Sequence, residues 1–304
     1  MAQDTITSRD NKWLKAFRAA LSGTGPSEAR SLGVEGAKLV TDAFSSGLEA
    51  EAILVSETGE RALAQILEAA ASSQTGIPRG RIFRTTDKLF AAIAGTETPQ
   101  GIAALFRQPI WGLEDLLRGR PGHDGAFSGA TPLIVVMAGV QDPGNVGTIV
   151  RSAEAFGATG AIATRGTADP WSPKALRASA GSALRIPLLR GMAVPVLLAQ
   201  LRFSQVRIVV AKAHETTQRH SGISLKECLQ GPAAIFVGNE GAGLPAEVEH
   251  AADANISIAM SDAVESLNAG VAAAIVLYET AKIRVIQPHT DTDKFQEKHA
   301  RDSR

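Results

Sequence analysis

The sequence contains one cysteine, Cys228, among its 304 residues. A single thiol excludes an internal disulfide and any zinc site built from several cysteines. The six histidines show no metal-ligand spacing, and the G-x-S-x-G motif of a serine nucleophile is absent. The sequence therefore predicts a protein of a reducing compartment, the cytoplasm, whose chemistry requires no metal.

Aromatic residues are scarce, at 5% of the chain, which argues against a sheet of stacking rings that holds single-stranded RNA. Positive charge is not in excess either, because 31 Lys and Arg balance 31 Asp and Glu. A nucleic-acid partner must then be held by local basic patches.

Long apolar runs are also missing. The most apolar segment, Ala269 to Leu277, is too short to span a bilayer, and residues 1–15 lack the apolar run of a secretory signal. We therefore expect no membrane contact. What the chain has is length and 44% apolar residues, which suffice for two domains with separate cores.

Short apolar runs alternate with amphipathic segments, which indicates two α/β units. In the first unit we expect helices over 10–21, 36–44 and 60–71 and strands over 52–55, 81–83 and 102–106. In the second we expect strands over 133–138, 160–163, 206–211, 233–237 and 256–258 and helices over 145–156, 173–180, 194–202 and 267–285. The strands of the second unit are almost wholly apolar, as in a parallel sheet covered on both faces.

The composition changes between the units. Residues 118–132 are rich in Gly, Pro, Ser and Ala, which is typical of a flexible linker. After Ile286 the chain has no apolar period and is expected to be disordered. We predict a first domain at 1–108, a linker at 109–131, a second domain at 132–286 and a disordered tail at 287–304.

Basic residues gather in two places. Residues 131–190 hold six basic and three acidic residues, a net charge of +3 in a neutral chain. In the first expected helix, basic residues recur every third position, at Arg9, Lys12, Lys15 and Arg18. These patches fit a polyanion that spans both units, although two solvated faces would give the same pattern.

Three glycine-rich segments carry the chemical signal. The first motif, residues 139–158, is GVQDPGNVGTIVRSAEAFGA. It follows an expected strand, and Asn145 is placed to cap the helix that begins there. Arg151 and Glu154 are three residues apart and can share a helix face. The glycine spacing is neither a dinucleotide fingerprint nor a P-loop, and a helix cap with a surface ion pair remains an alternative.

The second motif, residues 235–245, is IFVGNEGAGLP, and the third, residues 256–279, is ISIAMSDAVESLNAGVAAAIVLYE. Glycines at the carboxyl end of a buried strand let backbone amides approach a ligand. The small residues of the third motif permit close packing against a helix or a cofactor. A tight turn and a closely packed helix pair are the corresponding structural alternatives.

The three motifs in this order resemble the SpoU (TrmH-like) family of RNA ribose 2′-O-methyltransferases, part of the SPOUT superfamily. The resemblance covers residues 131–285 and includes DPWSPKALRASAGSALRIPL at 169–188. The N-terminal segments SRDNKWLKAFRAAL and GVEGAKLV resemble the RNA substrate-binding domain, a small α/β domain similar to RNA-binding ribosomal proteins, that often precedes it.

This resemblance implies a parallel sheet whose C-terminal part forms a deep trefoil knot, with S-adenosylmethionine as cofactor. It also implies a homodimer with the site at its interface. By the same resemblance, residues that hold the cofactor are Gly238, Ile258, Met260 and Leu267. Residues implied in catalysis and substrate placement are Asn145, Arg151, Glu240, Ser266 and Asn268. The pair Ala269–Gly270 departs from the family, which often has larger residues there.

The expected reaction moves a methyl group from a sulfonium to a ribose 2′-oxygen. Arg151 is the family's candidate for activating that oxygen, but a guanidinium is normally protonated and suits a phosphate. We therefore expect it to clamp a phosphate and to assist proton removal. The RNA backbone is expected to contact the basic helix and the stretch that includes Lys174 and Arg177, and rRNA is favoured over tRNA as substrate.

Two other functions stay open on the sequence. One is a non-catalytic RNA-binding or ribosome-assembly protein that retains the knotted fold, and the intact site residues argue against it. The other is an α/β enzyme acting on a small nucleotide, which lacks a phosphate-binding fingerprint here.

Overall fold

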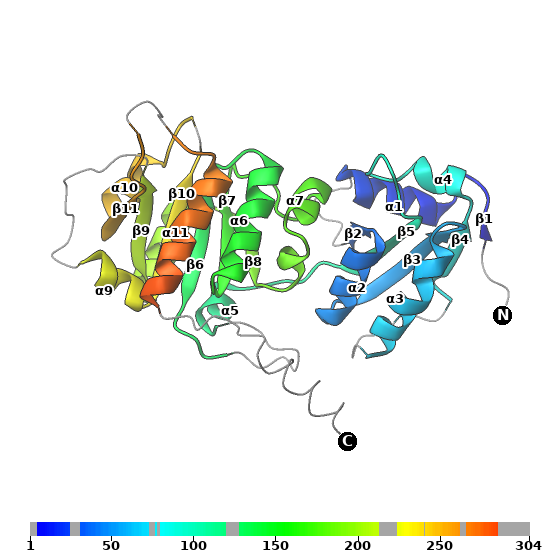
Figure 1. Ribbon diagram of the computed structural model, residues 1–304, viewed down its shortest axis with the longest axis horizontal. Coiled ribbons are helices and arrows are strands. Elements are labelled where there is room, and N and C mark those ends of the chain that lie inside the picture. Colours follow the sequence, from blue (N-terminus) through cyan, green and yellow to red (C-terminus); the bar gives the residue numbers. More distant parts are fainter. Residues whose placement is uncertain are drawn as a thin grey trace, which may run out of the picture.

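The computed structural model describes residues 5–24, 31–72, 77, 80–119, 128–212, 224–239, 241–261 and 266–284. They form two sheets that lie end to end, each built by one part of the chain (Figure 1). The expected tail, at 287–304, lies outside the described residues, as does 120–127 of the expected linker.

The first sheet has the strand order β1-β4-β3-β5-β2. Its strands are β1 (Thr5–Ile6), β2 (Ser31–Glu35), β3 (Ala50–Ser56), β4 (Ile82–Thr85) and β5 (Ile102–Arg107), and its helices are α1 (Lys12–Ser22), α2 (Ala37–Ser45), α3 (Glu60–Ser72) and α4 (Asp87–Ala91). Alternate residues of β3 point to opposite faces: Ile53 packs with α2 and α3, whereas Leu54 packs with α1 and α4. The expected α/β sandwich is confirmed. The short elements β1, β2 and α4 were not predicted.

The second sheet has the strand order β11-β9-β10-β6-β7-β8, and its described pairings are parallel. The strands are β6 (Leu133–Ala138), β7 (Gly160–Thr164), β8 (Leu188–Met192), β9 (Arg207–Lys212), β10 (Ala233–Gly238) and β11 (Ala254–Ser257). The helices are α6 (Pro143–Ala155), α7 (Pro173–Ala178), the 3-10 turn η1 (Ser182–Leu184), α8 (Val194–Phe203), α9 (Leu225–Gln230), α10 (Ala246–Ala251) and α11 (Ala269–Ile283).

Helices cover both faces of this sheet, as its apolar strands predicted. On β6, Val135 packs with the cluster that includes α6, α7 and α11, whereas Val136 packs with α8 and α10. The predicted parallel α/β sheet is confirmed, and the knot stays a prediction. No helix in the described ranges is both long and apolar enough to cross a bilayer.

Part of the expected linker is packed. Residues Leu113–Leu117 form helix α5, and the side chain of Leu116 is completely buried against Ile134 and Ile162. A helix of five residues is too short to show a period in the sequence. The division into domains stays a prediction.

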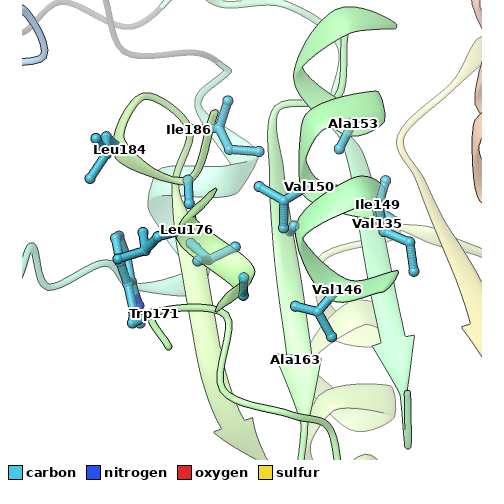
Figure 2. Close-up of a cluster of buried hydrophobic side chains, with 14 of the residues drawn as sticks. Val135, Val146, Ile149, Val150, Ala153, Ala163, Trp171, Leu176, Leu184 and Ile186 are labelled. Atoms are coloured by element: carbon cyan, nitrogen blue, oxygen red, sulfur yellow. The ribbon is translucent and has the colours of Figure 1, made fainter. Parts of the chain in front are cut away.

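Helix α6 is the central element of the core in Figure 2, which shows its buried side chains Val146, Ile149, Val150 and Ala153 between the sheet and the segment that follows β7. Two glycines allow close approach on either side of α6. A Cβ on Gly147 would lie 2.4 Å from the carbonyl oxygen of Ala175 in α7. A Cβ on Gly270 of α11 would lie 3.0 Å from Cγ2 of Thr148.

The C-terminal end of α11 is hydrogen-bonded to the residues that precede β6 and β10. The guanidinium of Arg284 donates to the carbonyl oxygens of Leu229 (2.6 Å), Thr131 (2.9 Å), Pro132 (3.0 Å) and Gly231 (2.5 Å). Burial lowers the pKa of Arg284 to about 10, so the guanidinium remains charged at neutral pH. One side chain therefore joins α11 to the residues that lead into β6 and β10.

The close packing of α6 on α7 is tested by Gly147→Ala. Alanine favours a helix more than glycine, but here its methyl group would collide with backbone atoms of α7. We expect the free energy of unfolding to fall by about 1–3 kcal/mol, measured by urea denaturation. The control is Gly231→Ala, where the nearest atom to the new Cβ is 4.0 Å away. Equal stability of the two variants would contradict the packing argument.

Candidate functional site

The three motifs begin at one edge of the second sheet. Ala138 of β6 is paired with Gly238 of β10, and Lys212 of β9 is paired with Ser257 of β11. Because these strands are parallel, their carboxyl ends share this edge, which is where open α/β sheets bind ligands. The next residues of the three motif-bearing strands are Gly139, Asn239 and Ile258.

The second motif closes into a tight turn immediately after β10. The backbone amides of Asn239 and Gly243 donate to each other's carbonyl oxygens, at 3.0 and 2.9 Å. The side-chain Oδ1 of Asn239 accepts from the amides of Gly241 (2.8 Å) and Ala242 (3.0 Å). A Cβ on Gly238 would lie 2.5 Å from the carbonyl oxygen of Gly243, so this turn requires glycine at 238.

Asn239 also ties the second motif to the first. Its Nδ2 donates to the carbonyl oxygen of Gly139 at 3.0 Å. The amide of Gly139 in turn donates to Oγ1 of Thr167, which donates to the carbonyl of Met137. The sequence analysis did not single out Asn239. The available signal was a polar side chain that follows a buried strand directly.

The beginning of α6 differs from the prediction. The N-cap is Asp142, whose Oδ2 accepts from the amide of Asn145 at 3.3 Å, so the expectation that Asn145 caps the helix is wrong. Proline at the first helical position, Pro143, favours this earlier start. The Nζ of Lys174 lies 2.6 Å from Oδ1 of Asp142. This hydrogen bond, with that from the amide of Gly144, lowers the pKa of the Asp142 carboxyl.

Asn145 is therefore available for a different contact, which joins the first motif to the third. Its Oδ1 accepts from Nδ2 of Asn268 at 2.8 Å. Asn268 is also the N-cap of α11, where its Oδ1 accepts from the amides of Gly270 (2.9 Å) and Val271 (3.2 Å). Two predicted site residues, 123 positions apart, are thus held together.

Arg151 is exposed on α6, six residues after Asn145, which corresponds to about 9 Å along the helix. Among the described residues it makes no hydrogen bond or ion pair. The alternative of a surface pair with Glu154 is wrong, because Glu154 binds Arg185 through both oxygens, at 2.6 and 2.7 Å. Arg151 therefore makes no polar contact, within the described ranges, with the loops of its own chain that carry the other site residues.

The remaining predicted residues lie in the loops after β11 and before α11. Ile258, Met260 and Leu267 are half-buried, and Ser266 is exposed. Glu240 lies outside the described residues. Among the described residues, no group of three His, Cys, Asp or Glu side chains could hold a metal ion.

The groups at this edge suit the cofactor that the resemblance implies. Above Gly139 and Gly243, both in the left-handed region, a Cβ would meet nothing within 4 Å, so the backbone there is accessible. The half-buried apolar residues Ile258 and Met260 follow β11, whose carboxyl end lies at the same edge of the sheet. Backbone amides and carbonyls beside apolar side chains are the features typical of small-molecule cofactor sites.

The basic helix has the form that the sequence predicted. The side chains of Leu14, Phe17 and Leu21 are buried on one face of α1. The basic residues Arg9, Lys12, Lys15 and Arg18 are exposed, and Lys15 pairs with Asp10 at 3.0 Å. Lys174 and Arg177 belong to α7. In Figure 1, α1, α7 and α10 all lie in the upper part of the molecule as drawn.

Both parts of the chain match known protein families. Residues 132–278 match the SpoU rRNA Methylase family, and residues 27–104 match the MRM3-like substrate binding domain. A relative from Bacillus subtilis (strain 168), named 23S rRNA (guanosine(2553)-2′-O)-methyltransferase RlmP, is 30% identical over 275 residues. That match covers 90% of this chain and 97% of the relative.

Solved structures of related proteins superimpose on nearly the whole chain. The crystal structure of an AdoMet-bound rRNA methyltransferase from Sinorhizobium meliloti superimposes with a TM-score of 0.73 at 28% identity, covering 92% of this chain and 97% of the other. An RNA 2′-O ribose methyltransferase superimposes with a TM-score of 0.69 at 27% identity, covering 93% of this chain and all of the other.

The double role of Asn268 can be separated by substitution. Asn268→Ala removes the cap of α11, and we expect the free energy of unfolding to fall by about 1 kcal/mol. Asn268→Asp keeps an oxygen acceptor at the helix N-terminus and should retain most of that stability. Asn145→Ala removes the contact between the motifs but leaves the cap of α11, and it serves as the control. Thermal denaturation measures all three, and an unchanged Asn268→Ala variant would contradict the capping role.

Proposed function

This chain belongs to the SpoU rRNA methylase family, and we propose that it transfers the methyl group of S-adenosylmethionine to a ribose 2′-hydroxyl of RNA. The observation that carries the proposal is the pair of contacts that join the three motifs. Asn239 binds the carbonyl of Gly139, and Asn268 binds Asn145. Together they place family motifs from three parts of the sequence at one edge of the sheet.

In the proposed site, the strand-end loops hold the cofactor, which supplies a methyl group made electrophilic by the sulfonium. The backbone around Gly238, Ile258 and Leu267 would hold it, and Met260 would line the part of the site that takes the adenine. The turn at Asn239 is fixed by its own hydrogen bonds, so the shape of its backbone is set before the cofactor arrives.

The protein must also activate the 2′-hydroxyl, which is a poor nucleophile at neutral pH. A guanidinium is a donor that carries no free base in the accessible pH range, so an arginine does not suit the role of an ordinary base. We assign Arg151 to binding a phosphate of the target nucleotide and to stabilising the oxygen as its proton leaves to that phosphate or to water. Asn145, Glu240, Ser266 and Asn268 position the substrate and the loops around it.

We propose that a second copy of the chain brings Arg151 to such a site. On α11 the apolar residues Val271, Ile275 and Tyr278 lie on one face and are 48%, 36% and 51% exposed. Helix α6, which carries Arg151, lies beside α11 in Figure 1, and the ring of Phe156 contacts that of Tyr278. We propose that this surface, the α6–α11 face, binds a second copy of the chain and presents Arg151 to the loops of that copy.

We propose ribosomal RNA in the cytoplasm as the substrate. The Bacillus subtilis relative is named for action on 23S rRNA, and the first domain matches a substrate-binding domain. The basic face of α1, with Lys174 and Arg177, would contact the phosphates. Lys174 would then bind RNA while it also holds the start of α6 through Asp142.

Replacement of Arg151 tests the reaction. Arg151→Ala should lower methyl transfer from labelled S-adenosylmethionine to RNA by about 100-fold or more, because both the phosphate contact and the oxygen's stabilisation are lost. Cofactor affinity, measured by calorimetry, should be nearly unchanged. Arg207→Ala is the control, since Arg207 begins β9 at the opposite edge of the sheet. A wild-type rate for Arg151→Ala would show that the assignment is wrong.

The α6–α11 face is tested by Ile275→Glu. Two buried carboxylates would meet near the proposed symmetry axis, so the variant should sediment as a monomer where the wild type is a dimer. It should also lose methyl transfer. Phe203→Glu on α8 is the matched control, because Phe203 is 92% exposed and belongs to a different face. A monomeric wild type with full activity would contradict the dimer proposal.

A further inference from the structure

The two domains meet along a mainly apolar seam. One small cavity there is lined by Leu21, Val34 and Leu39 of the first domain, by Pro173, Leu176 and Leu184 of the second, and by the charged residues Glu35 and Arg177. Figure 2 shows Leu176 and Leu184 on the side of the second-domain core that is turned away from α6. Buried residues of both domains belong to one hydrophobic cluster, and an apolar interface restricts the relative motion of domains.

A charged contact crosses the same seam. Arg185, just after η1, binds Glu154 of α6 through Nε and Nη2, at 2.6 and 2.7 Å. Its Nη1 lies 3.9 Å from Oδ2 of Asp42, which belongs to α2 in the first domain. Hydrogen bonding to Glu154 raises the pKa of Arg185. The guanidinium therefore sits between one carboxylate of each domain.

This contact is partly shielded from water. The side chains of Arg185, Glu154 and Asp42 are 36%, 23% and 19% exposed. Screening is weaker at such a site than for a fully exposed pair. The bidentate hydrogen bond between Arg185 and Glu154 also has a defined geometry, which a single exposed ion pair lacks.

Gly181 keeps the space for this contact. A Cβ on Gly181 would lie 2.8 Å from Nη1 of Arg185 and 2.9 Å from Oδ2 of Asp42. The backbone at Gly181 has φ of +87°, which also favours glycine. A larger residue at 181 would therefore stand between the guanidinium and the carboxylate of the other domain.

Glu154 is three residues from Arg151 on the same helix. We propose that Arg185 is a positioning residue that couples the placement of the substrate-binding domain, through Asp42, to the helix that carries Arg151, through Glu154. This inference rests on the proposed function, in which the first domain holds the RNA and Arg151 acts on it. The two carboxylates then have separable roles: Asp42 affects how RNA is held, and Glu154 affects the chemical step.

Steady-state kinetics on the full-length protein distinguish these roles. Asp42→Asn should raise the KM for RNA about fivefold at constant kcat, because the domain that holds RNA is less well oriented. Glu154→Gln should lower kcat about fivefold with a smaller change in KM. Arg185→Gln should both raise the KM for RNA and lower kcat. The KM for S-adenosylmethionine should not change in any of the three variants.

The matched control is Glu49→Gln, which breaks an ion pair with Arg107 inside the first domain. It should leave both kinetic constants unchanged. Asp42 also pairs with Lys38 at 3.2 Å inside the first domain, so the double-mutant cycle is carried out in a Lys38→Gln background. There Asp42→Asn should add little to Arg185→Gln, since the contact is already lost. If the variants lower only the thermal stability, or if the Asp42→Asn and Arg185→Gln effects simply add, Arg185 has a structural role and the inference is overturned.

Small-angle scattering provides a readout that does not depend on activity. Asp42→Asn and Arg185→Gln should increase the radius of gyration by loosening the seam, whereas Glu49→Gln should not. Unchanged scattering for all variants would overturn the inference even if methyl transfer is intact. A wild-type protein that binds S-adenosylmethionine but methylates no RNA, while the scattering differences hold, would instead overturn the proposed function.

Discussion

The close approach of three helices organises the second domain. Helix α6 touches α7 through Gly147, at a distance that leaves no room for a side chain, and α11 through Gly270, where a Cβ would crowd the side chain of Thr148. Because α6 carries Asn145, Arg151 and Glu154, these two contacts determine where the first motif, the proposed dimer surface and the seam between the domains lie. The small residues at these points take part in site geometry although they have no chemistry of their own.

Two asparagine side chains, Asn239 and Asn268, connect the motifs that the helix packing brings close together. Asn239 and Asn268 each hold backbone amides of their own turn with one oxygen and reach another motif with their nitrogen. An amide can do both because it carries an acceptor and a donor on one planar group. Carboxylates would hold the turns equally well but could not donate to the neighbouring oxygen. The site is thus fixed by neutral groups, which leaves the charge of Arg151 uncompensated by the residues around it in the described chain.

The sequence predicted the long, strongly apolar elements well. The β6, β9 and β10 strands and the helices α1, α6 and α8 all appear within a few residues of their expected bounds. Elements with too few residues for a period, such as β1, α5 and α10, were missed.

The partner of Glu154 was also beyond prediction, because Arg185 is 31 residues away and the fold alone brings them together. Asn145 shows a similar limit: residue type suggested a cap, but Pro143 moved the start of the helix and gave the cap to Asp142. The roles of Arg151, Glu240 and the loop residues came from family resemblance, and they stay predictions.

The attachment made by Arg284 has a consequence for biosynthesis. The first sheet is complete once residue 107 has been made, so that domain has all its strands while the rest is still being translated. The second domain differs, since the backbone leading into β6 is bound by a side chain 152 positions later. The contact that joins this backbone to α11 therefore forms only after residue 284 has been made, and at typical elongation rates that interval is about 10–30 s. During this time the edges and apolar faces of the half-made sheet are exposed, and such species are prone to aggregation.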